Sequence, residues 1–107
     1  MKTPYRTLLA AAACALLIAT PALAQQKRLA IATGGTGGVH YPMGGAIASV
    51  VTKSIPGVEA TAEVTSASVD NMRLIGAGKA DIAFTLADTA WDAYTAGGKF
   101  KEKLRVR

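Results

Sequence analysis

The chain has 107 residues, and its 12 lysines and arginines against 7 aspartates and glutamates give a formal net charge of +5 at pH 7. The surplus lies at the two ends, because residues 27–98 hold five bases and six acids. A nucleic-acid-binding domain carries its basic residues on a folded face, so the nearly neutral middle argues against nucleic acid as a partner. The length allows one domain at most and excludes a complete two-lobed protein.

Residues 1–24 follow the three-part pattern of a secretory signal peptide. Lys2 and Arg6 form a short basic region, and residues 8–19 form an uninterrupted apolar run. Residues 22–24 (Ala-Leu-Ala) supply the small side chains that a signal peptidase requires. The apolar run is shorter than the roughly 20 residues of a membrane-spanning helix. We therefore expect export to the periplasm with cleavage after Ala24; the alternative is an alanine-rich helix buried at the start of the fold.

The residue types limit the chemistry that this chain can perform. Cys14 is the only cysteine and lies within the apolar run, so the mature chain would have no disulfide and no thiol chemistry. His40 is the only histidine, which excludes a histidine–cysteine metal cluster. We expect no metal and no cofactor, and we expect His40 to line a pocket or the surface.

The mature chain begins with a strand, a glycine-rich loop and a helix. Residues 29–33 (LAIAT) are apolar and β-branched, which predicts a buried strand. Residues 34–38 (GGTGG) predict a loop. The segment from about Pro42 to residues 56–57 (Pro-Gly), which end it, predicts an amphipathic helix. One side of this helix has an apolar stripe of the kind that faces a core. The stripe is formed by Met43, Ile47, Val50 and Val51.

A second strand and helix follow. Residues 58–65 (VEATAEVT) alternate apolar and polar side chains, which predicts a strand with one solvated face near a sheet edge. Residues 66–68 predict a turn, with Ser68 as a candidate helix N-cap. The spacing of Val69, Met72 and Ile75 predicts a short helix that ends at Gly76 or Gly78.

A third unit repeats this order. Residues 80–86 (ADIAFTL) predict a strand, and Asp88 is a candidate cap for the helix that follows. We expect Trp91 and Tyr94 to lie on one face of this helix and to pack in the core. Residues 97–98 (Gly-Gly) predict its end.

This repeated order predicts an α/β fold with a parallel sheet and flanking helices. In such a sheet, ligands bind beyond the carboxyl ends of the strands, where residues 34–41, 65–71 and 86–89 form the three loops. The glycine loop precedes a helix N-terminus, an arrangement that favours an anion. The other polar groups are the hydroxyls of Thr36, Ser66 and Ser68, the Asn71 amide and the Asp88 carboxylate. Ser68 and Asp88 remain open between ligand contact and simple capping.

Two nucleotide-binding interpretations of the glycine loop fail. A dinucleotide fingerprint starting at Gly35 would need glycine at His40, and no Gly-Lys-Ser/Thr tripeptide provides a P-loop. One histidine without a neighbouring acid gives no nucleophile–base–acid trio. We expect a binding protein that is not an enzyme.

The loops resemble a known family. Residues 35–45 (GTGGVHYPMGG) are similar to the GTGGxxYPxGG motif of the TAXI family, and the resemblance extends over residues 27–107. A second family element, T-x-G-S-x-x-N, is matched by Thr65, Ser68 and Asn71, with Ala67 in place of the glycine. In the third loop, a Gln-x-Asp element is matched by Asp88, with Leu86 in place of the glutamine; His40 stands where the family often has a second tyrosine.

The resemblance implies a solute-binding protein of a tripartite ATP-independent periplasmic (TRAP) transporter. Such receptors have a periplasmic-binding-protein-like fold with two α/β lobes and deliver a glutamate-like amino acid or dicarboxylate to ion-gradient-driven permease subunits in the membrane. Residues 25–107 would form part of the first lobe. The expected ligand-binding residues, from the residue types and the resemblance together, are Thr36, Gly37, Gly38, Tyr41, Ser66, Ser68, Asn71 and Asp88.

The family's proteins are much longer, and residues 104–107 stand where a fourth strand of the first lobe should start. We expect an N-terminal fragment that binds its ligand weakly or not at all by itself. Two other functions stay open at this stage. One is an exported α/β enzyme whose catalytic residues lie in a missing C-terminal part, and the other is a sensory or interaction module.

Overall fold

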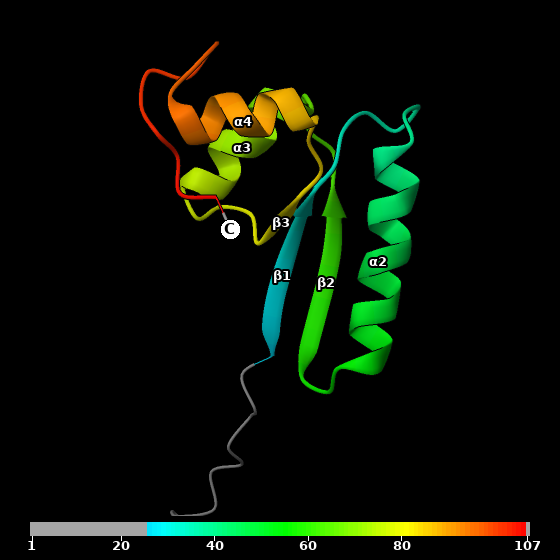
Figure 1. Ribbon diagram of the computed structural model, residues 1–107. Coiled ribbons are helices and arrows are strands. Elements are labelled where there is room, and N and C mark those ends of the chain that lie inside the picture. The colour runs from blue at the N-terminus through cyan, green and yellow to red at the C-terminus, as the bar shows by residue number, and fades with distance from the viewer. Residues whose placement is uncertain (1–25, 107) are drawn as a thin grey trace, which may run out of the picture.

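The computed structural model describes residues 26–106. The predicted signal peptide, including Cys14, and Arg107 lie outside the described residues. Strands and helices alternate along the chain as predicted (Figure 1). The elements are β1 (Lys27–Ala32), α2 (His40–Ser54), β2 (Val58–Glu63), α3 (Ser68–Gly76), β3 (Ile82–Ala83) and α4 (Ala87–Thr95).

The strands form a parallel sheet in the order β2-β1-β3. Ile31 in the central strand pairs with Ala62 on one side and with Ile82 on the other, and it is completely buried. The predicted α/β class with a parallel sheet is confirmed. β2 lies at an edge of this sheet, which agrees with the alternation of its half-buried and exposed side chains, such as Ala62 and Glu63.

β3 is much shorter than the predicted strand over residues 80–86. At its start, Asp81 exchanges two hydrogen bonds with Ala30: the Asp81 N–H donates to the Ala30 carbonyl, and the Ala30 N–H donates to Asp81 Oδ2, both at 2.9 Å. A side chain therefore takes the place of a backbone acceptor in the ladder. At its end, the Phe84 carbonyl accepts from the Asn71 side chain, and the chain turns towards α4.

The apolar stripe that was predicted to face the core lies on the side of α2 that points away from the sheet. The helix turns Gly44 and Ala48 towards the sheet, and both are buried. Met43, Ile47 and Val50 are exposed. The reason is the close approach of helix and sheet, because a Cβ built on Gly44 would overlap Thr33 of the chain segment after β1. Small side chains make this approach possible, and the larger ones point away from it.

α3 and α4 pack on each other and enclose the main apolar cluster. Its buried members are Met72, Ala93 and Phe100. Trp91 and Tyr94 are 65% and 58% exposed, so the prediction that they pack in the core is wrong. α4 presents the small side chain of Ala93 to α3, and its two aromatic residues lie outside with ring centroids 6.4 Å apart.

The predicted C-terminal end of α3 is confirmed, but the two predicted N-cap residues are wrong. α3 ends at Gly76, and Gly78 follows it with a φ of 68°. Ser68 and Asp88 are not N-caps, because Ala67 and Leu86 occupy those positions without a side-chain hydrogen bond. Ser68 Oγ instead accepts a hydrogen bond from the Leu86 N–H, which lies just before α4.

The segment after α4 returns to the α3–α4 cluster. The Leu104 N–H donates to the Ala93 carbonyl at 2.8 Å. Leu104 and Val106 pack on the cluster, while Arg105 between them is exposed. This alternation is what an extended segment with one covered face would show.

Candidate functional site

Three loops meet at the carboxyl ends of the strands, as the parallel order predicts (Figure 1). The Thr65 N–H donates to the Gly34 carbonyl at 3.4 Å, which joins the β2–α3 loop to the β1–α2 loop. The Leu86 N–H donates to Ser68 Oγ at 3.1 Å, which joins the β3–α4 loop to the start of α3. The three loops therefore form one connected surface.

Asn71 links the first and third loops at the points where they leave β1 and β3. Its side chain is completely buried, and its Nδ2 donates to the carbonyls of Thr33 and Phe84, both at 2.7 Å. All the acceptors of this amide nitrogen are backbone carbonyls, which require a donor and therefore favour this orientation of the amide. Asn71 Oδ1 is buried and has no hydrogen-bond partner within residues 26–106. The amide thus holds the ends of β1 and β3 together and leaves one acceptor unused.

Thr33 links the first and second loops in a similar way. It is completely buried, and its backbone N–H and its Oγ1 both donate to the Glu63 carbonyl, at 3.0 and 2.6 Å. Thr33 and Asn71 together tie the carboxyl ends of all three strands. The loops above them therefore start from fixed positions.

A hollow of about 310 Å³ lies between the first two loops. His40 stands in its wall at the start of α2, as expected for a pocket residue, and its ring stacks on Phe84 with centroids 5.2 Å apart. The other lining residues are Gly34, Gly35, Gly38, Val39 and Ala67. Peptide groups and the His40 imidazole are the polar groups that it offers to a ligand, beside the apolar side chains of Val39 and Ala67.

The predicted site residues have different positions relative to this hollow. Gly38 lines it, and its N–H donates to the Gly35 carbonyl in a turn. Thr36 and Gly37 are exposed at the tip of the same loop, and Ser66 is exposed at the bend before α3. These residues leave hydroxyl and peptide groups accessible at one edge of the sheet.

Asp88 and Tyr41 do not line the hollow. Asp88 is exposed in the first turn of α4, where its Oδ1 accepts from the Thr89 N–H at 2.6 Å. Tyr41 is half-buried and borders a different hollow, between α2 and β2, together with Ala48 and Ala60. The structure therefore brings the loops together but does not bring Tyr41 into the hollow between them.

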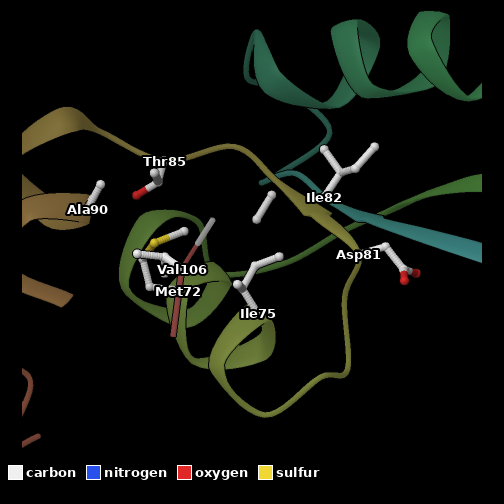
Figure 2. Close-up of a pocket in the computed structure, with 8 residues that line it drawn as sticks. Met72, Ile75, Asp81, Ile82, Thr85, Ala90 and Val106 are labelled. Atoms are coloured by element: carbon white, nitrogen blue, oxygen red, sulfur yellow. The ribbon is translucent and has the colours of Figure 1, made fainter. Parts of the chain in front are cut away.

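Another hollow, of about 390 Å³, lies beside β3 and contains none of the predicted site residues (Figure 2). Its lining is mostly apolar: Met72, Ile75 and Val106 gather on one side, and Asp81 lies at the opposite end. No local sequence pattern predicts this hollow, because it forms between segments that are distant in the sequence, such as α3 and Val106.

Ala67 was missed as a lining residue, and its backbone is strained. It has φ 72° and ψ −150°, a region that is essentially restricted to glycine. The one available signal was its alignment with the glycine of the T-x-G-S-x-x-N element.

We expect Ala67→Gly to stabilise the chain by about 1 kcal/mol. Relief of about 1–3 kcal/mol of strain exceeds the added flexibility of the unfolded glycine chain, about 0.4–1 kcal/mol. Urea unfolding measures the change. Ala77→Gly is the matched control, because Ala77 has an ordinary φ of −84° and should lose stability on the same change. A loss of stability in Ala67→Gly would contradict the strain.

The connected loops suit reversible binding of a small polar molecule. No group of three or more His, Cys, Asp or Glu side chains in residues 26–106 is arranged to hold a metal ion. None of the helices described here is long and apolar enough to cross a membrane. Peptide groups, hydroxyls and a carboxylate at a sheet edge are groups that orient a ligand by hydrogen bonds.

The fold and its loop edge define a partial periplasmic-binding-protein-like α/β domain. The sequence profile of the NMT1-like family matches residues 31–107, which include every helix described within residues 26–106 and the whole of the loop surface. The chain therefore belongs to the NMT1-like family. This membership indicates a solute-binding-like domain whose partner is a small-molecule ligand.

Proposed function

We propose that this chain is the first-lobe part of a TAXI-type receptor of a TRAP transporter, exported to the periplasm after cleavage at Ala24. In this role it takes up a solute without catalysis and passes it to permease subunits in the membrane. The observation that carries the proposal is the connection of three polar loops into one surface through Thr33, Ser68 and Asn71. A surface anchored in this way keeps its donors and acceptors in place before a ligand arrives.

The charges at this edge favour an amino acid over a dicarboxylate. Asp88 is an exposed carboxylate in the third loop region, which suits an ammonium group. The first turn of α2 contains no acidic residue and follows the glycine loop, so its N-terminus suits a carboxylate. A zwitterion such as glutamate would satisfy both charges, whereas a dicarboxylate would meet repulsion from Asp88.

Titration of the mature chain, residues 25–107, with glutamate and with succinate tests this proposal. We expect glutamate to bind weakly, in the millimolar range typical of weak contacts, and to shift the NMR amide signals of residues 34–38, 66–68 and 86–89. Asp88→Asn should weaken glutamate binding by roughly tenfold, the effect of about 1.4 kcal/mol, and should not weaken succinate binding. Shifts that fall outside these loops would reject the site, and equal losses for both ligands would reject the amino-acid preference.

A further inference from the structure

A continuous apolar stripe runs along the outer side of α2. It consists of Val39, Met43, Ile47 and Val50, which are 70%, 49%, 38% and 63% exposed. We call these four residues the outer stripe. Single exposed apolar residues are ordinary, but a contiguous exposed row marks a surface that another segment covers.

The outer stripe has the shape of a docking surface. Ile47 and Val50 border a shallow hollow of about 250 Å³ whose remaining lining, Ala46 and Val51, is also apolar. The outer stripe does not contact the sheet, because α2 packs on the sheet through Gly44 and Ala48 on its other side. The stripe is therefore available to a second apolar segment.

Such a segment exists in the same chain. Residues 8–19 are apolar and uncharged, and they lie outside the described residues. They are joined through residues 20–26 to β1, where the Lys27 N–H donates to the carbonyl of Gly57 in the turn after α2. The apolar run is therefore tethered near the C-terminal end of α2.

The tether is long enough to reach the outer stripe. Residues 20–26 span at most about 25 Å when fully extended. α2 has 15 residues, and a helix of that size is about 22 Å long. The run can therefore lie along the whole stripe.

We propose that residues 8–19, before cleavage, pack on the outer stripe of α2. A short linker gives a partner an effective concentration in the millimolar range, which favours this intramolecular contact over a second copy of the chain in dilute solution. Cleavage after Ala24 would then remove the cover and expose the stripe. The contact would shield both apolar surfaces in the uncleaved chain.

Cys14 makes the contact measurable, because it is the only cysteine and lies in the middle of the apolar run. The full chain carrying Ile47→Cys is oxidised with diamide at low protein concentration, and the products are identified by mass spectrometry. Ser49→Cys is the matched control: it is nearly isosteric, exposed and two residues away on the other side of the same helix. We expect the intramolecular disulfide to form roughly tenfold faster at position 47, as a bound rather than freely tethered partner would allow.

Two further measurements make the result independent of one variant. Val50→Cys, at the most exposed helical position of the stripe, should repeat the result of Ile47→Cys. Met43→Lys, added to Ile47→Cys, should reduce the cross-linking rate to that of Ser49→Cys. Equal rates at positions 47 and 49 would show tethering alone and overturn the proposal. Disulfide-linked dimers, or no cross-link at positions 47 and 50, would also overturn it.

Discussion

Replacing Gly44 with alanine is expected to destabilise the domain by about 2–3 kcal/mol, the upper range for overpacking a core. A Cβ at this position would overlap Thr33 Cγ2 and would lie 3.5 Å from Phe84 and 3.6 Å from Ala62. Thr33 cannot turn away at low cost, because it is completely buried and its Oγ1 donates to the Glu63 carbonyl at 2.6 Å. α2 must then move away from the sheet. Urea unfolding of the mature chain measures the loss as a lower midpoint.

Gly45→Ala is the matched control for this experiment. Gly45 is the next residue in α2, and a Cβ there would have no neighbour within 4 Å. Alanine in an open helical position is favoured over glycine by roughly 0.5–1 kcal/mol, so this variant should be more stable than the parent chain. The two adjacent changes are thus expected to have opposite signs. Equal effects at both positions would contradict the packing of α2 described above.

The alternation of strands and helices was predictable because it depends on local patterns. Residues 58–65 alternate visibly, and the glycines and prolines mark the ends of the elements. Parallel pairing followed from the order of the elements. The meeting of three loops at one edge followed in turn, since parallel strands carry all their carboxyl ends on one side.

The choice of buried faces was not predictable from local patterns. Periodicity identifies the most apolar face of α2, but the face that packs is set by the closest approach between helix and sheet, where Gly44 meets Thr33. The same holds for α4, where Ala93 packs and Trp91 does not. Both helices use small residues at the contact, and hydrophobicity alone does not distinguish such a contact from a polar face.

The roles of polar residues depend on partners that are distant in the sequence. Ser68 has the right type for an N-cap, but it lies one residue inside α3, and its Oγ accepts from the Leu86 N–H in another loop. Asn71 was predicted as a ligand residue, and that prediction remains to be tested; its Nδ2 is already occupied by the carbonyls of Thr33 and Phe84. A single sequence shows which groups can form hydrogen bonds, whereas the fold determines which of them remain accessible to a ligand.

Asn71→Ala is expected to cost about 3–5 kcal/mol, because the buried Thr33 carbonyl and the partly buried Phe84 carbonyl lose their donor at about 1–3 kcal/mol each and a cavity is left. A loss of this size is a large part of the stability of a small domain, and the loop ends of β1 and β3 should separate. Urea unfolding gives the loss, and hydrogen exchange of residues 33–38 and 84–86 locates it. Ser66→Ala, on an exposed side chain, should change stability by less than about 0.5 kcal/mol.

Asn71→Asp separates the loss of the donor from the loss of volume. The aspartate fills the same space but, when ionised, directs two acceptors at the carbonyls of Thr33 and Phe84. Burial and these carbonyls favour the protonated carboxyl, which can still donate one hydrogen bond, so the variant should approach the stability of the parent chain as the pH falls. The stability difference between the two is therefore expected to be larger at pH 7 than at pH 4. A difference that does not change with pH would show that the amide does not hold the strand ends through donated hydrogen bonds.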